Sequence, residues 1–304
     1  MPELTLGINL CFARKRWTKP EEWLPLVRDR IGVGVVEFCS DILDPLLTPA
    51  DAAAEMAGRI RDQAAKFGVE ILDYYTGVIT HCLCLLSDPD ARLRQVGIDW
   101  CRGACMLAAQ MSAKGIGGHF DTIPYPDWSD PSRYAACIDR LVDSAKIVAK
   151  DAKAAGLQFV LWEQMYTPSE IPYRIGQAKD FYRRANNGSA VPVHATVDVG
   201  HACCQNYEHS PEDHDPYAWL RELGASSPVI HLQQTDANGS HHWPFTPQHN
   251  AKGIIKPEKV IEALEKSGSK RNCLVLEIFH SLAAPEDRML DELAWSARYW
   301  KQYI

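Results

Sequence analysis

Short apolar segments rich in β-branched residues alternate along the whole chain with longer segments of helical period. This alternation is typical of α/β folds, in which each strand is followed by a helix that packs on the sheet. The segments predicted as strands are Leu4–Leu10, Val33–Cys39, Val69–Tyr75, Gly115–His119, Leu157–Glu163, Val193–Asp198, Val229–Thr235 and Cys273–Phe279. The segments predicted as helices are Pro20–Arg30, Pro49–Phe67, Asp88–Met111, Pro131–Ala155, Pro168–Ala185, Pro216–Leu223, Lys256–Lys266 and Pro285–Trp300.

The number and spacing of these units favour a closed barrel over an open sheet. The 304 residues divide into eight units of about 38 residues, which is the size of one strand and helix with their loops. A doubly wound dinucleotide-binding sheet would carry a Gly-x-Gly-x-x-Gly motif after its first strand, and none follows Leu10. We therefore expect one (β/α)8 TIM-barrel domain over residues 1–304, with a long loop near residues 236–253 on the active face.

The charge balance and the apolar content of the chain indicate which binding partners and which cellular compartment to expect. Lys and Arg number 32 against 39 Asp and Glu, a formal net charge of -7 with no long block of either sign. A nucleic-acid-binding protein needs a basic surface, so we expect no nucleic-acid partner, although a small anionic ligand remains open. The first residues do not form a signal peptide, and no apolar run approaches the about 20 residues of a membrane span. We expect a soluble cytoplasmic protein without a membrane partner.

The ten cysteines form no Cys-x-x-Cys pair. At this low density in a long chain, they are expected to be free thiols rather than disulfides or zinc ligands. The sequence does not predict the oligomeric state, and a homo-oligomer, which is common among such barrels, remains open.

The last four predicted strands each end in residues that can bind a cation. Glu163, Asp198 and Glu277 supply carboxylates, and the seventh strand carries His231 and Gln233. In a TIM barrel the carboxyl ends of the strands meet at one face, so these side chains are expected to converge there. Three carboxylates at one mouth would repel one another unless a cation held them together. The pattern predicts one divalent metal ion bound by Glu163, Asp198, Gln233 and Glu277.

The ligand types indicate which metals fit this site. Carboxylate and amide oxygens suit Mn2+ or Mg2+, and a histidine in place of the amide would also suit Co2+ or Zn2+. His231 and Gln233 share one face of their strand because they are two residues apart. Gln233 is nearer the mouth and is the preferred ligand, but His231 stays an alternative. A single acidic residue at a strand end more often caps the next helix, whereas ligand-type residues on four consecutive units favour the metal interpretation.

Other polar and aromatic residues lie close to these strand ends in the sequence. His201 follows Asp198 by three residues and is expected to donate a hydrogen bond to a ligand oxygen. His119 ends the fourth predicted strand and is a candidate for substrate contact; for both histidines, a purely structural role in the loop is the alternative. Trp162 is expected to face away from the interior of the barrel and to belong to the hydrophobic core. Glu37 could contact substrate or form a buried salt bridge.

The segment Thr235–Thr246 contains several histidines and aromatic residues where polar turn residues are usual. Long ordered loops on the active face commonly bind ligands. His242 and Trp243, together with Lys252, are therefore candidates for binding a phosphate or sugar hydroxyls. Anchoring of the loop to the barrel rim by its aromatic rings is the alternative.

Four short motifs carry a resemblance to a known superfamily: Trp162-Glu163, Thr196-Val-Asp198-Val-Gly-His201, His231-Leu-Gln233 and Leu276-Glu277. At these residues the chain resembles the xylose isomerase-like TIM-barrel superfamily of sugar and sugar-phosphate isomerases and epimerases, and the similarity spans nearly the whole chain. The resemblance implies one divalent metal bound by the last four strands, with Glu163 and Glu277 as acid and base. Through Gln233-Gln-Thr-Asp236 and His241-His-Trp-Pro-Phe-Thr246 the chain resembles the erythrulose-phosphate 3-epimerase branch.

The resemblance and the residue inventory together predict a divalent-metal-dependent epimerase of a short ketose phosphate, with erythrulose phosphate as the expected substrate and an enediolate as intermediate. If the second glutamate returns a proton to the carbon that lost one, the centre is inverted. Return of the proton to the neighbouring carbon would instead give aldose–ketose isomerisation, which is the alternative. A noncatalytic sugar-binding barrel and an abasic-site DNA endonuclease are further alternatives, and the net charge weighs against the endonuclease. The expected partner is a small-molecule sugar or sugar phosphate.

Overall fold

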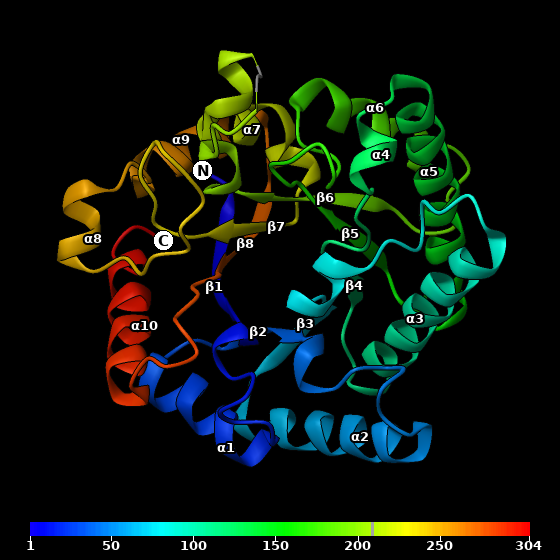
Figure 1. The fold of residues 1–304 in the computed structure, drawn as a ribbon. Coiled ribbons are helices and arrows are strands. Elements are labelled where there is room, and N and C mark those ends of the chain that lie inside the picture. Colours follow the sequence, from blue (N-terminus) through cyan, green and yellow to red (C-terminus); the bar gives the residue numbers. More distant parts are fainter. Residues whose placement is uncertain (208–209) are drawn as a thin grey trace. The chain divides into compact units, whose positions relative to one another are not determined.

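The computed structural model describes residues 1–207 and 210–304. Its parallel strands form one closed barrel in chain order, β1 to β8, which confirms the predicted fold class (Figure 1). The strands are β1 (Glu3–Asn9), β2 (Val35–Cys39), β3 (Glu70–Tyr75), β4 (Gly115–Gly117), β5 (Phe159–Glu163), β6 (Val193–Asp198), β7 (Val229–Leu232) and β8 (Arg271–Leu276).

The helices follow the strands as expected, with two short additions. They are α1 (Pro20–Pro25), α2 (Ala50–Phe67), α3 (Ala91–Gln110), α4 (Tyr125–Trp128), α5 (Pro131–Ala154), α6 (Ile175–Asn186), α7 (Pro216–Leu223), α8 (Pro247–Lys252), α9 (Pro257–Ser267) and α10 (Glu286–Trp300). Carboxylates of Asp90, Asp130 and Asp215 accept hydrogen bonds from backbone N–H groups in the first turns of α3, α5 and α7. These caps satisfy donors that have no partner within the helix and so define where each helix begins.

Two differences from the sequence prediction have clear local causes. Helix α6 begins at Ile175 rather than at Pro168. The residues before it form a tight turn in which Thr167 pairs with Glu170, and Pro172 disfavours a helical conformation at the residue before it. The second difference is α8, which lies inside the predicted loop 236–253 and begins with a proline after a capping Thr246.

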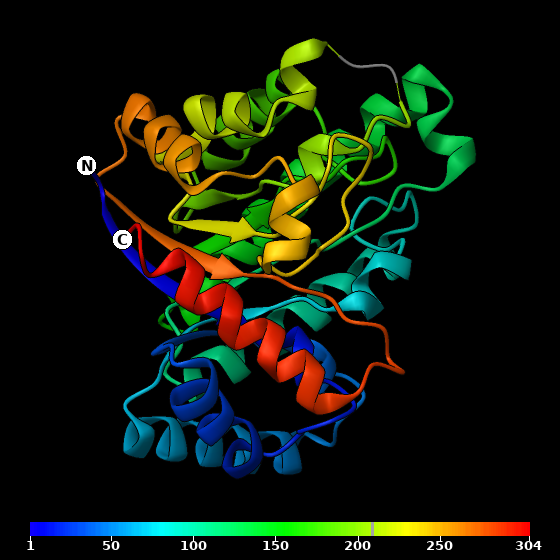
Figure 2. The same cartoon turned by 90° about the vertical axis from the view of Figure 1, so that its left-hand side faces the viewer.

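Contacts between Cα atoms group the chain into two units, which we describe separately. The first unit comprises Met1–Phe38, Asp62–Ile71 and Thr196–Ile304. In it, β1 pairs with β8 from Glu3↔Arg271 to Ile8↔Leu276, and β7 pairs with both β6 and β8. Helix α7 lies beside α9, and α10 lies beside the π-helical segment η2 (Leu26–Ile31) that continues α1 (Figure 2).

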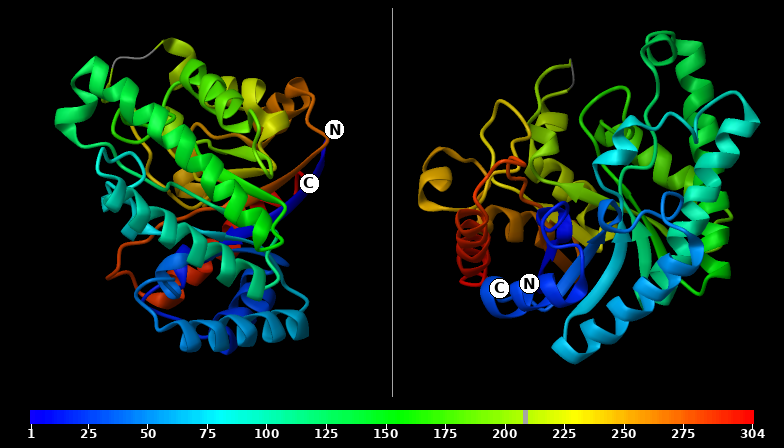
Figure 3. Two further views of the ribbon diagram at one scale, coloured as in Figure 1. Left: turned by 90° about the vertical axis from the view of Figure 1, so that its right-hand side faces the viewer. Right: turned by 60° about the horizontal axis from the view of Figure 1, so that its bottom comes forward.

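The second unit comprises Cys39–Arg61 and Leu72–Ala195. In it, β4 pairs with β3 and β5, and α5 packs between α3 and α6 (Figure 3). As predicted, no disulfide bond joins any of the ten cysteines, all of which lie within the described residues. Among the described residues, no helix is both long enough and apolar enough to cross a membrane.

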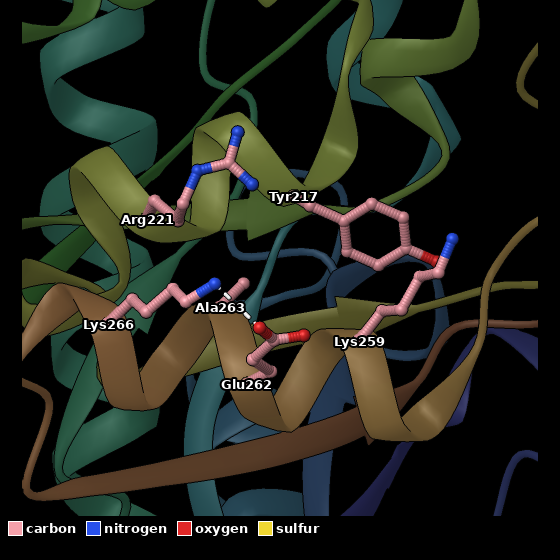
Figure 4. A pocket seen from close by; sticks show the side chains of 6 residues that line it. All are labelled: Tyr217, Arg221, Lys259, Glu262, Ala263 and Lys266. Atoms are coloured by element: carbon pink, nitrogen blue, oxygen red, sulfur yellow. Dashed lines mark hydrogen bonds and ion pairs between the residues drawn. The ribbon is translucent and has the colours of Figure 1, made fainter.

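A surface cavity of about 220 Å³ lies between α7 and α9 of the first unit (Figure 4). Arg221 projects from α7, and Glu262 and Lys266 project from α9, where they form an ion pair at 2.6 Å. These lining residues are surface charges, and none of them belongs to the predicted site.

Candidate functional site

The polar residues of the first unit converge on His231 of β7, whose side chain is fully buried. Its Nε2 lies 2.8 Å from Oε2 of Glu37 on β2. Its Nδ1 lies 3.2 Å from Oε2 of Glu277 and 4.0 Å from Oδ2 of Asp198. One imidazole thus lies among three carboxylates. Glu37 forms the buried ion pair that was one of its two predicted roles.

Asp198 is the last residue of β6, and a set of donors fixes its orientation. Its Oδ1 accepts hydrogen bonds from the backbone N–H groups of Gly200, at 2.6 Å, and His201, at 3.0 Å. Its Oδ2 lies 4.0 Å from a ring nitrogen of His201 and from one of His231. The backbone N–H of His201 thus donates to one oxygen of Asp198, and its ring lies near the other; the predicted role of this imidazole as a donor to a metal-ligand oxygen stays a prediction.

Gln233 lies one residue past β7 and is fully buried. Its Nε2 lies 2.9 Å from Oδ1 of Asp198 and 2.9 Å from Oγ of Ser240. Its Oε1 accepts a hydrogen bond from the backbone N–H of His242 at 2.6 Å. A Cβ atom at Gly200 would lie 2.1 Å from Cδ of Gln233, so the close approach of this amide requires glycine at that position.

Glu277 lies one residue past β8 and is 6% exposed. Burial raises the pKa of its carboxyl, but the imidazoles of His231 and His242 outweigh this effect and hold the pKa of Glu277 below its ordinary value. Glu277 is therefore a carboxylate at neutral pH, as a metal ligand or a general base must be. His242 lies with Nδ1 at 3.1 Å from the backbone oxygen of Glu277, and burial lowers the pKa of this histidine.

Asn9, the last residue of β1, also lies among these side chains, although it was not one of the predicted site residues. Its Nδ2 donates to Oε2 of Glu37 at 3.2 Å and reaches Oε1 of Glu277 at 3.5 Å, and the residue is 1% exposed. The criterion that found the other site residues, a polar side chain at the end of an apolar strand, would also have found Asn9.

The arrangement fits a divalent cation by the chemistry of its donors. Asp198, His231 and Glu277 each offer one ligand atom, and these atoms lie within 4.8 Å of one another. Asp198, His201 and His242 form a second group of three that shares Asp198 with the first. Carboxylate, amide and imidazole groups together match the ligand preferences of Mn2+, Mg2+, Co2+ and Zn2+.

Glu163 belongs to the second unit, where it is the last residue of β5 and is 4% exposed. Burial and then the charge of Glu163 raise the pKa of Tyr182, which places that carboxylate close to the tyrosine. The preceding Trp162 is 1% exposed, and its ring centroid lies 5.0 Å from that of Phe181. The prediction that Trp162 belongs to the core is confirmed.

His119 also belongs to the second unit and lies two residues past β4, with 1% of its surface exposed. Its ring lies 4.8 Å from that of His81, and its Nε2 lies 3.6 Å from Oε1 of Glu170. The sequence did not point to His81, which lies in the short 3-10 helix η4 (Val78–Cys82), or to Glu170, which lies inside a predicted helix. Their meeting with His119 depends on three loops that are separate in the chain.

The loop after β7 places its aromatic and charged residues in two groups. His242 turns toward Gln233 and stacks on Phe279 at 4.2 Å. Trp243 stacks on His241 at 4.2 Å, and Nζ of Lys252 lies 3.7 Å from the centroid of the Trp243 ring. The aromatic face thus holds the ammonium group by a cation–π contact.

The sequence profile of the family described as xylose isomerase-like TIM barrel matches residues 28–299. D-erythrulose 1-phosphate 3-epimerase of Brucella abortus (strain 2308) is 27% identical over 303 residues, which cover 99% of this chain and 96% of that protein.

Solved structures share the fold over nearly the full chain. A candidate xylose isomerase from Rhodospirillum rubrum is 24% identical, with a TM-score of 0.90 and 99% of both chains covered. D-psicose 3-epimerase from Clostridium cellulolyticum H10 is 15% identical, with a TM-score of 0.71 and coverage of 98% of this chain and 99% of that one. At these identities, the structural matches show the fold alone. Since the family profile covers most of the chain, from η2 to the end of α10, the protein belongs to the xylose isomerase-like TIM-barrel family.

Proposed function

We propose that the protein is a divalent-metal-dependent isomerase that epimerises a short ketose phosphate, with erythrulose phosphate as the substrate. The observation that carries the proposal is the buried convergence of Asp198, Gln233 and Glu277 at the ends of three barrel strands, with His231 between the two carboxylates. The likeness to D-erythrulose 1-phosphate 3-epimerase, which extends over both chains, supports the reaction and the substrate.

Glu163, Asp198, Gln233 and Glu277 would hold the metal ion. Glu163 ends β5, and β5 and β6 are neighbours in the order of the barrel strands. Its carboxylate therefore belongs to the end of the barrel that carries Asp198. Bound there, a cation such as Mn2+ or Mg2+, or alternatively Co2+ or Zn2+, would polarise the carbonyl group of the ketose.

The two glutamates would move the proton. Glu277 can accept the proton from C3, and Glu163 can return one to the other face of the same carbon. In the reverse direction the two residues exchange roles. Proton return to the neighbouring carbon would give aldose–ketose isomerisation, so the relative positions of C3 and the two carboxylates decide the outcome.

The remaining predicted residues are proposed to bind the substrate. His201 and His242 lie beside Asp198 within the cluster of ligand atoms and can donate hydrogen bonds to sugar oxygens. His119 from the second unit and Trp243 would contact the sugar. Lys252, held over the Trp243 ring, would bind the phosphate group by charge.

Proton exchange tests the proposal directly. Metal-loaded protein is incubated in D2O with erythrulose phosphate and with a panel of C3 to C6 ketoses and their phosphates, and the C3 proton is followed by NMR. We expect deuterium at C3 together with the C3 epimer of the substrate. Formation of an aldose would favour the isomerase alternative. The absence of label in every sugar would contradict an enzymatic function and leave the noncatalytic sugar-binding barrel.

Two substitutions on and beside β7 decide which residue binds the metal. Gln233→Leu is expected to weaken metal affinity by at least about 100-fold, because it removes a ligand oxygen. His231→Gln is expected to cost about 10-fold, because it removes only a group that orients Glu277 and Asp198. The measurement is competition for Mn2+ against a chelator of known affinity. A larger loss in His231→Gln than in Gln233→Leu would make His231 the ligand instead.

A further inference from the structure

Three side chains from the loops after β3, β4 and β5 meet in the second unit. His81 Nδ1 lies 2.9 Å from Glu170 Oε1, and His119 Nε2 lies 3.6 Å from the same oxygen. One ligand atom from each residue can be chosen so that all three lie within 4.8 Å of one another. None of the three belongs to the proposed ligand set of Glu163, Asp198, Gln233 and Glu277.

The spacing of these atoms suits a tetrahedral metal ion. Ligands about 2.0–2.1 Å from zinc in tetrahedral geometry lie about 3.3 Å apart. The separations of 2.9 Å and 3.6 Å between the imidazole nitrogens and the Glu170 oxygen lie on either side of that value. Two histidines and one carboxylate with a fourth position left for water or substrate form a ligand set that zinc enzymes use.

The loops that carry these residues are tied to one another. Thr122, after β4, donates its side-chain hydroxyl to the backbone oxygen of His81 at 3.0 Å, and its backbone N–H to Leu83 at 2.8 Å. Ile123 donates its N–H to the backbone oxygen of Ser169, in the loop that carries Glu170, at 2.7 Å. Each loop is thereby positioned by its neighbour before any ligand binds.

Hydrogen bonds also orient the individual side chains. The backbone N–H of His119 donates to the hydroxyl of Thr76 at 2.9 Å, and Gly118, with φ of 127°, allows the chain to turn tightly there. The hydroxyl of Thr167 lies 3.3 Å from Oε2 of Glu170, which leaves Oε1 facing the two imidazoles. A hydrogen-bonded carboxylate of this kind is typical of the surroundings of a bound metal.

Exposure differs among the three side chains in a way that suits a binding site. The side chains of His119 and Glu170 are 1% and 10% exposed, whereas that of His81 is 37% exposed. A cation can therefore reach the group from solvent on the His81 side while the other two ligands remain shielded. A buried carboxylate also gains more from a cation than a solvated carboxylate would.

We infer that His81, His119 and Glu170 bind a second divalent cation, of the borderline type represented by Zn2+. This site shares no ligand with the proposed set at the ends of β5 to β8, and in it His119 binds the cation instead of contacting the sugar directly. In it, His81 contributes Nδ1, His119 contributes Nε2 and Glu170 contributes Oε1. The inference does not depend on the sugar that the protein acts on.

The test counts metal ions per chain. The full-length protein is stripped with a chelator, incubated with Zn2+, desalted and analysed by mass spectrometry for bound metal, and Co2+ is used in parallel for its visible absorption in tetrahedral sites. Wild type is expected to retain two equivalents. His81→Ala and Glu170→Gln are each expected to lose one equivalent and the tetrahedral Co2+ band, and His249→Ala on α8 is the control expected to retain both.

A variant of the other site separates this inference from the proposed function. Asp198→Asn is expected to lose one equivalent and to keep the one that His81→Ala removes. If Asp198→Asn has no effect while His81→Ala loses metal, the second site stands and the ligand set at β5 to β8 is wrong. The inference is overturned if both His81→Ala and Glu170→Gln retain as much Zn2+ as wild type while their circular dichroism is unchanged. The two histidines would then only form ion pairs with the Glu170 carboxylate.

Discussion

Glu277→Gln is expected to slow deuterium exchange at C3 of the ketose phosphate by about a thousandfold, within the range that general acid–base catalysis contributes. The amide keeps the size of the side chain and an oxygen for the metal, but it cannot accept a proton. Glu163→Gln is expected to slow formation of the C3 epimer by a similar factor, because return of a proton to the opposite face of C3 needs Glu163. The measurements are the rates of label incorporation and of epimer formation, both followed by NMR at saturating substrate and metal.

A matched control separates chemistry from binding. Glu258 lies on the exposed face of α9, and Glu258→Gln is expected to leave the exchange rate unchanged. Substrate affinity of the two site variants, measured by calorimetry, is expected to stay within about tenfold of wild type, since the binding groups remain. Normal turnover in either Glu277→Gln or Glu163→Gln would contradict its assignment as acid or base.

Trp162→Ala is expected to lower the free energy of unfolding by about 4 kcal/mol, the usual cost of removing a large buried aromatic side chain. Trp162 is 1% exposed, and its ring lies 5.0 Å from those of both Phe120 and Phe181. Its Nε1 also donates a hydrogen bond to the backbone oxygen of Ile171 at 3.1 Å. Loss of the ring leaves a cavity and an acceptor without its donor.

The comparison for this substitution is Trp295→Ala on α10, where the tryptophan is 45% exposed. We expect its cost to stay below about 1 kcal/mol, because a partly solvated side chain leaves little cavity. Both values are measured by equilibrium unfolding in urea at one fixed metal concentration. Equal losses in the two variants would show that the packing around Trp162 contributes little to stability.

The local pattern of apolar and polar residues was sufficient to predict most of the strands and helices. The predicted bounds of β6, Val193–Asp198, and of α7, Pro216–Leu223, agree with the structure at both ends. In both segments the periodicity and the residues at the ends point to the same element. The start of α6 was wrong because the pairing of Thr167 with Glu170 replaces the first turns that the helical pattern suggested.

Some features of the candidate site could likewise be predicted from local sequence, and others could not. Asp198, Gln233 and Glu277 could be found because each lies at or one residue past the end of an apolar strand, and parallel strands bring such ends together in any closed barrel. The choice between the two predicted roles of Glu37 could not be made in this way. Its partner His231 is 194 residues away in the sequence, and no local sequence pattern predicts a contact between residues so far apart.

The sequence by itself determined the class of fold and which strand ends carry carboxylate, amide and imidazole groups, because strand and helix periods are local properties and barrel geometry turns them into a shared face. Only the tertiary structure decided how His231 lies among three carboxylates, and that His81, His119 and Glu170 meet at all. Loops have no period, so their side chains come together through backbone hydrogen bonds between segments distant in sequence. Such contacts exist only once the whole chain has folded.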